Sequence, residues 1–371
     1  MRWREAVGAI VGLFVVTRGA LVLIATFLER NIPLAYHGPT YSSAPVLSSL
    51  TGTDSIYLLG IAAQGYHAEP ISKGFLDWAF FPLYPLVTRA VSVLTFGDMA
   101  VAGVIAANVA FVAALVVLYR LAVPHLGHDG AVRSLAFVAL APGAVAFAMA
   151  YTDSLFLLLA AGAFLAAEQR RWPWMAILYG LASLTRPQGI LLGLPLLVML
   201  IQASGEGRTS RLGWLTPRLG WLAGGPIAVA GFGAYLGATF GDPLGMLHAQ
   251  QAWTDIGQPG TGPSSAIPVL DRSDALVLLL IGVLLLYTFL LLFRRVDRLP
   301  LAYSVMALVA ILLPLATLRL NSSARFMAAI WPFGWILAKR RSPLFELLGL
   351  PVFAMLFVIY GFLNLSQTLA P

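Results

Sequence analysis

The sequence predicts an all-α protein that crosses a lipid membrane many times. Hydrophobic residues make up 59% of the 371 residues and charged residues only 11%, whereas a soluble domain usually carries about 25% charged residues. Long apolar runs recur along the whole chain, and a helix needs about 20 such residues to cross a bilayer. A chain this poor in charge could not cover a surface in contact with water. We therefore expect a single integral-membrane domain over residues 1–371.

The apolar runs fit about eleven transmembrane helices. Arg2 and Arg4 precede the first run, which predicts a cytoplasmic N-terminus because basic residues favour that side of the membrane. This run lacks a small-residue cleavage site, so we interpret it as a retained span rather than a signal peptide. The predicted spans are 6–28, 99–121, 131–150, 154–167, 172–184, 190–203, 219–240, 275–293, 300–318, 324–338 and 343–363.

The apolar segment 82–96 has two interpretations, a short span or a helix that lies at the membrane surface. Its run is short, and Arg89 lies in its middle, which favours the interfacial helix. If it stays outside, all four basic loops face the cytoplasm, as the positive-inside rule requires. If it spans, they all face outward. The loops are 169–172, 205–218, 294–298 and 339–341.

The same count of crossings places the polar segments together on the outer face. Residues 29–96 form an extracytoplasmic loop with interfacial helices, and residues 241–274 form a second outer loop. The short segments 151–153 and 319–325 and the turn 185–189 join them. We therefore expect a multi-pass protein of the inner (plasma) membrane, whose active site faces the periplasm or exterior.

Several function classes do not fit the composition. The chain has no cysteine, which excludes disulfides and thiolate chemistry, and its five histidines show no zinc-ligand spacing. The net charge of +7 comes from basic residues at the ends of apolar runs, which is the pattern of a topology signal and not of a nucleic-acid footprint. No P-loop is present, so a nucleotide-activated sugar is not expected as the substrate.

Two aspartates start predicted helices on the outer face. Asp54 either caps its helix or acts as a general base at the membrane surface, since a base needs a deprotonated group placed on a hydroxyl. Tyr57 follows it on the same helix. Asp153 either caps the next span or, beside Tyr151, binds a sugar hydroxyl.

Three arginines lie on the outer face, against the positive-inside trend. Arg186 lies in the turn that breaks the apolar sequence near residues 184–189, and Arg319 and Arg325 flank another short segment. Arg186 could belong to a plain turn. Arginine at membrane depth usually has a partner, and phosphate is a natural partner for a guanidinium. We predict that these residues bind a phosphate.

The second outer loop offers side chains that suit sugars. His248, Gln250, Gln251 and Trp253 lie close together there. Aromatic rings stack on sugars and amides bind hydroxyls, although an aromatic belt at the membrane interface would give a similar pattern.

Five segments resemble a known family when taken in order. They are an aspartate in the first outer loop, Ile61-Ala62 followed by Gly65-Tyr66, the run Ala79 to Pro85, Tyr151 to Phe156, and Ser183 to Gly189. Together they resemble the GPI mannosyltransferase 2 (PIG-V type) family and its bacterial relatives, within the GT-C superfamily of glycosyltransferases that use lipid-linked sugars. Thr53 stands where that family usually has tryptophan.

The resemblance implies a GT-C fold and the inverting transfer of mannose from polyprenyl-phosphate-mannose to an acceptor hydroxyl on a glycolipid or glycan. It implies that Asp54 is the base, that Asp153 is a second acidic site and that Arg186 belongs to the arginine-glycine turn. No carboxylate cluster for a metal is present, and no cofactor is expected. A transporter or flippase of polyprenyl-linked sugars, or a non-catalytic membrane subunit, remain alternatives. The acceptor, linkage and oligomeric state are left open by the sequence.

Overall fold

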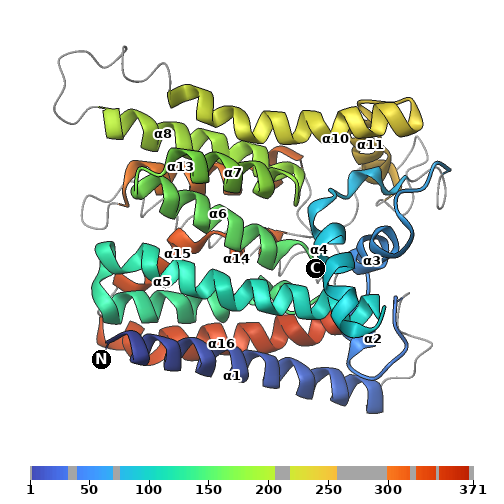
Figure 1. Ribbon diagram of the computed structural model, residues 1–371. Helices are drawn as coiled ribbons and strands as arrows, with labels where there is room; N and C mark the ends of the chain where they lie inside the picture. Colours follow the sequence, from blue (N-terminus) through green and yellow to red (C-terminus); the bar gives the residue numbers. More distant parts are fainter. Residues whose placement is uncertain are drawn as a thin grey trace, which may run out of the picture.

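The computed structural model describes residues 2–31, 40–69, 76–204, 218–256, 299–317, 323–339 and 342–366. Within these ranges the chain is helical, and its single β-bridge, between Thr40 and Gly52, belongs to no strand. The expected all-α fold is confirmed there. The long helices lie side by side in a stack (Figure 1).

The main helices of the stack follow the predicted spans closely. They are α1 (Arg2–Asn31), α5 (Met99–Ala139), α6 (Asp153–Glu168), α7 (Trp172–Ser183), α8 (Gly193–Ser204), α10 (Gly224–Phe240), α13 (Leu301–Thr317), α15 (Trp331–Lys339) and α16 (Pro343–Leu365). In the described residues, four helical segments are long and apolar enough to cross a membrane, namely Arg2–Asn31, Met99–Ala139, Gly220–Phe240 and Pro343–Leu365. The other described spans correspond to shorter helices, and the predicted span 275–293 lies outside the described residues.

Two predicted spans are wrong in their extent. The α5 segment contains two helical arms that meet at Gly127, whose φ of 69° breaks the helix. The second arm stops at Ala139, and a 3₁₀ helix, η4 (Pro142–Phe147), follows instead of a span to residue 150. The local reason is Pro142, because the residue before a proline disfavours the α conformation, and Ala141 there has ψ 143°. The 3₁₀ helix η4 then packs closely on Ala324, since a Cβ on Gly143 would lie 2.0 Å from its carbonyl oxygen.

The predicted span 324–338 is also interrupted. A short helix, α14 (Ser323–Ala328), ends before α15 begins, and Pro332 lies at the start of α15. Proline fits the first turn of a helix but cannot continue a helix from its preceding residues. The interruption faces η4, against which α14 packs.

The first outer loop lies at the end of the stack opposite the N-terminus, together with α11 (Gly245–Ile256) (Figure 1). Its helices are α2 (Leu47–Leu50), α3 (Asp54–Gln64), the 3₁₀ turn η2 (Asp77–Ala79), α4 (Leu83–Ser92) and the 3₁₀ turn η3 (Val93–Thr95). Helix α4 has ten residues, buries Tyr84 and Thr88 and leaves Leu86 exposed. This length and pattern agree with the predicted interfacial helix.

Candidate active site

Asp54 is the first residue of α3 and points its carboxylate toward a distant arginine. Thr53 occupies the N-cap position with φ 52° and makes no side-chain cap hydrogen bond, so the capping interpretation does not describe Asp54. Instead, Arg325 Nη1 donates to Asp54 Oδ2 over 2.8 Å. The Thr53 hydroxyl is hydrogen-bonded to the Tyr151 hydroxyl, which fixes the start of α3 against the segment before α6. A threonine with positive φ is uncommon and is typical of functional sites.

Asp153 is fully buried at the start of α6, between two arginines. Arg325 Nε donates to its Oδ2 over 2.8 Å, and Arg186 Nη2 lies 2.8 Å from its Oδ1 as an ion pair. Thr152, not Asp153, occupies the N-cap position. A buried carboxylate is tolerable only when such partners compensate its lost hydration, so Asp153 is the anchor of the two arginines.

Arg186 reaches the site from a break between α7 and α8. The backbone there is extended and leads into the 3₁₀ helix η5 (Pro187–Leu192). A Cβ on Gly189 would lie 2.4 Å from the Ala182 carbonyl oxygen, so the turn needs glycine to fold back on α7. The guanidinium donates to Thr152 Oγ1 over 2.9 Å. Its buried position is therefore set by Thr152 and Asp153, at the start of α6.

Arg325 pairs with two carboxylates, whereas Arg186 pairs with one. Arg325 contacts Asp54 and Asp153 at once, and its guanidinium lies 4.5 Å from the centre of the Tyr151 ring. Two carboxylates and a ring face leave it 7% exposed. The two arginines and the two aspartates together carry no net formal charge.

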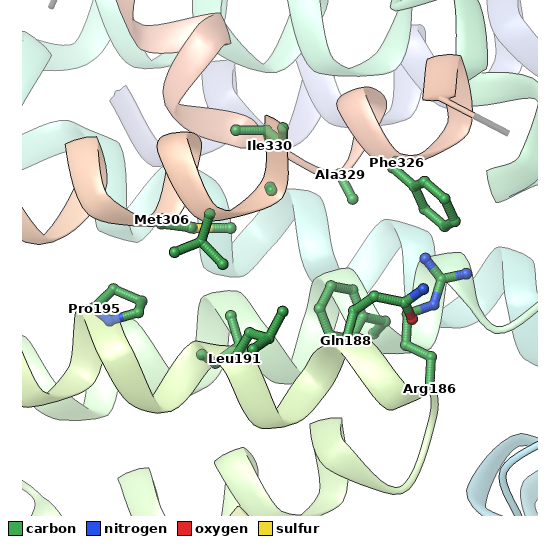
Figure 2. Close-up of a pocket in the computed structure, with 12 residues that line it drawn as sticks. Arg186, Gln188, Leu191, Pro195, Met306, Phe326, Ala329 and Ile330 are labelled. Atoms are coloured by element: carbon green, nitrogen blue, oxygen red, sulfur yellow. The ribbon is translucent and has the colours of Figure 1, made fainter. Parts of the chain in front are cut away.

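Three of these four charged residues border a cavity of ≈ 130 Å³. Asp54, whose side chain is 26% exposed, lines it together with both arginines. A second, apolar pocket of ≈ 60 Å³ adjoins it, because Arg186, Gln188 and Phe326 line both. Figure 2 shows this pocket between the η5–α8 segment and α13 to α15, with Arg186 and Gln188 at one end and Pro195 at the other. The site thus combines a charged chamber with an apolar channel.

No group of three His, Cys, Asp or Glu side chains that could hold a metal ion occurs in the described ranges. Asp54 and Asp153 are joined by Arg325. The chamber that the structure describes is therefore built around arginine.

Several predicted sugar-binding residues do not line the charged cavity. Tyr151 and Asp153 are fully buried. Asp153 pairs with both arginines, and the Tyr151 ring lies against Arg325. Tyr57 stacks on Phe80 with ring centroids 5.2 Å apart. His248 pairs with Asp242 over 2.7 Å, a hydrogen bond that lowers the pKa of the Asp242 carboxyl, and His248 does not line the cavity.

The remaining predictions fall on parts that are not described. Arg319 lies outside the described residues, as do the side chains of Gln251 and Trp253, whose backbone belongs to α11. The neighbouring Gln250 lines the cavity and donates to the Ala79 carbonyl over 2.9 Å. Gln250 is thus the member of the predicted group in this loop that lines the cavity in the described residues.

Sequence reasoning also missed a polar clamp behind the site. Arg18, in α1, donates to Asn108 Oδ1 over 2.7 Å and to the Phe147 carbonyl over 2.9 Å, and Asn108 Nδ2 donates to the Ala148 carbonyl over 3.1 Å. These bonds satisfy carbonyls of the irregular segment that leads to Asp153. The available signal was an arginine in the middle of an apolar run, which is expensive without partners.

The family comparison covers the middle of the chain. Residues 81–233 match the profile of a family described as "Dolichyl-phosphate-mannose-protein mannosyltransferase". This segment contains Asp153 and Arg186 but neither Asp54 nor Arg325. No curated protein matches the sequence.

Solved structures show a weak similarity over nearly the whole chain. The oligosaccharyltransferase of Archaeoglobus fulgidus in the apo form matches with a TM-score of 0.49 and 13% identity, over 96% of this chain and 55% of that one. The same enzyme tethered to an acceptor peptide with an NVT sequon through a disulfide matches with a TM-score of 0.46 and 13% identity, over 95% and 55%. This chain therefore spans about half the length of that enzyme, and at these values the similarity does not bear on function. The family match supports the expected GT-C class of membrane glycosyltransferase and does not reach the PIG-V subtype.

Proposed function

We propose that this protein is a GT-C membrane glycosyltransferase that moves mannose from polyprenyl-phosphate-mannose to an acceptor hydroxyl, with inversion. One observation carries the proposal. Asp54, Asp153, Arg186 and Arg325 come from four separate segments and form one cluster of ion pairs. Asp54, Arg186 and Arg325 line one cavity that adjoins an apolar pocket. The match of residues 81–233 to a mannosyltransferase family supports the choice of sugar.

Asp54 has the exposure and support that a general base needs. Arg325 holds its Oδ2, and within the described part of the chain Oδ1 has no protein partner. Asp54 takes the proton of the acceptor hydroxyl, whose oxygen attacks the anomeric carbon. The bond between this carbon and the phosphate oxygen breaks, and polyprenyl phosphate leaves with the electron pair. The configuration inverts because the attack is in line.

The phosphate of the donor fits Arg186 better than Arg325. Arg325 is already shared by two carboxylates, whereas Arg186 pairs with one and lines both the charged cavity and the apolar pocket. A guanidinium binds a phosphate through charged hydrogen bonds and stabilises the leaving group. The apolar pocket would then take the first part of the polyprenyl chain. Arg325 acts as the positioning residue of Asp54, which revises its predicted role as a phosphate ligand.

The site lies at the end of the stack that carries the first loop and α11 (Figure 1). We propose that this end faces the periplasm or exterior of the plasma membrane, where a lipid-linked sugar donor would meet a glycolipid or glycan acceptor. The four basic loops of the sequence, assigned to the cytoplasm, support this orientation.

The test compares two aspartates. Purified protein in liposomes receives polyprenyl-phosphate-mannose and a glycolipid extract of the native membrane, and release of polyprenyl phosphate is measured. Asp54→Asn should lower turnover at least ~10²-fold, within the usual range for general-base catalysis. Asp98→Asn is the matched control, because Asp98 caps α5 through Val101 and asparagine caps a helix equally well.

The result also separates the alternatives. Near-normal turnover of Asp54→Asn would remove Asp54 from the mechanism. Movement of the donor lipid across the bilayer by wild-type protein, without release of polyprenyl phosphate, would favour the transporter alternative.

A further inference from the structure

A separate groove lies between the interfacial helices and α10. Its volume is ≈ 510 Å³. Its walls are mostly apolar and come from α3, α4 and α10, with Ile61, Leu86, Ile227, Gly231, Phe232 and Tyr235 among them. The exposed fraction is 58% for Leu86 and 68% for Ile227, so the groove opens toward the surroundings of the stack, where lipid is expected.

The groove and the charged cavity beside Asp54 share no lining residue. The Phe81 ring, which lines the charged cavity, packs on Phe232 of the groove with centroids 5.3 Å apart. Leu83 N–H donates to the Leu184 carbonyl over 3.0 Å beside them. These contacts lie between the groove and the charged cavity, so we treat the groove as a second site.

A single basic residue borders the groove. Arg89, an exposed residue of α4, lines it and donates from Nε to the Ala62 carbonyl over 2.6 Å. That bond fixes the guanidinium without neutralising it. No described carboxylate forms an ion pair with Arg89. Among the described residues, Arg89 therefore has no ion-pair partner at the edge of this apolar groove.

We propose that this groove binds one anionic phospholipid of the bilayer, with the lipid phosphate on Arg89 and an acyl chain between α4 and α10. A guanidinium favours a phosphate through charged hydrogen bonds, and α4 has the length and exposed apolar face of a helix at headgroup depth. A free phosphate would leave the apolar walls unfilled, and a lipid without net charge would leave Arg89 uncompensated. This inference does not depend on the proposed transferase activity.

Native mass spectrometry of the whole detergent-solubilised chain tests the proposal, with phosphatidylglycerol and phosphatidylcholine as probes. The wild type should retain one phosphatidylglycerol per chain in preference to phosphatidylcholine. Arg89→Ala should weaken phosphatidylglycerol binding about fivefold, the effect of about one basic residue at a membrane surface. Arg89→Lys should keep most of the affinity, because it keeps the charge.

A second variant fills the groove while keeping the charge. A Cβ on Gly231 would meet nothing within 4 Å, so Gly231→Leu should fold normally and exclude the acyl chain, with at least a fivefold loss for phosphatidylglycerol. Gly12→Leu in α1 is its matched control, because a Cβ there also meets nothing within 4 Å, and it should bind like the wild type.

Two results would overturn the proposal. The first is wild-type binding of phosphatidylglycerol by both Arg89→Ala and Gly231→Leu. The second is equal retention of the two lipids by the wild-type protein.

Discussion

At the end of the stack that carries α3 and α11, the charges are buried together, whereas at the opposite end they stay near the surface. Asp153 is fully buried, and Arg186 and Arg325 are 5% and 7% exposed. Near the N-terminal end, the side chain of Glu168 is 22% exposed and pairs with His125, which is 28% exposed. The two ends belong to the same helices, so helix composition does not explain the contrast.

The difference lies in the backbone. At the buried end the helices break before Asp153, before Arg186 and after α14, and η4 and η5 replace regular turns. At the other end the two arms of α5 meet in a compact turn at Gly127. Irregular backbone at membrane depth survives where it is packed in protein or lines a cavity. The breaks thus provide both the room and the polar partners for buried charge.

The largest expected effect is at Asp153. Asp153→Asn keeps the shape but leaves Arg186 and Arg325 short of one negative charge in a buried site. Removing one member of a buried ion pair typically costs about 3–5 kcal/mol, so thermal unfolding in detergent should shift strongly and activity should be lost. An unfolding midpoint equal to that of the wild type would contradict the anchoring role.

Alanine variants of Arg186 and Arg325 should change different kinetic quantities, namely donor binding and kcat. Arg186→Ala should weaken donor binding by roughly 10- to 100-fold, since a hydrogen bond to a charged group contributes about 1.5–3 kcal/mol. Arg325→Ala should act mainly on kcat, because it releases Asp54. Donor titration and turnover measured on both variants check this. Arg186→Lys should recover only part of the affinity, because lysine cannot form a bidentate contact. Equal effects of the two alanine variants on donor binding would contradict the proposal that Arg186 binds the phosphate while Arg325 positions Asp54.

A smaller effect is expected at the opposite end. Glu168 accepts hydrogen bonds from Tyr303 and His125. Glu168→Gln keeps acceptor capacity and should cost about 0.5–1.5 kcal/mol of stability, as for an ordinary hydrogen bond, without changing donor turnover. Urea or thermal unfolding and the transfer assay measure the two quantities. A loss of turnover as large as that of Asp54→Asn would break the contrast between the ends.

The side of the membrane that each end of the stack faces can be measured by labelling single cysteines. The natural chain has no cysteine, so single cysteines placed at Gln169 and at Leu244, both exposed, can be labelled by a membrane-impermeant thiol reagent in intact cells. We expect labelling at position 244 and protection at position 169. The reverse pattern would place the site in the cytoplasm.

The site was only partly predictable from the sequence. Asp54, Asp153, Arg186 and Arg325 could be selected because charge is rare in this chain and each lies between apolar runs. The ion pairs between them could not be predicted, since Arg325 and Asp54 are 271 positions apart in the sequence. Gln250 could be named with its neighbours His248, Gln251 and Trp253, but which of them faces the cavity depends on what the helix packs against. His248 was expected at the site and pairs with Asp242 instead.

By itself, the sequence determined the helical class, the positions of most described helices and the grouping of polar segments at one end, because hydropathy and charge act locally along the chain. Only the tertiary structure decided where helices break and which charges pair. Gly143 of η4 approaches Ala324 closely, and Asp153 is buried between two arginines. Such contacts join residues far apart in sequence, and their energies depend on distances and burial that no local pattern contains.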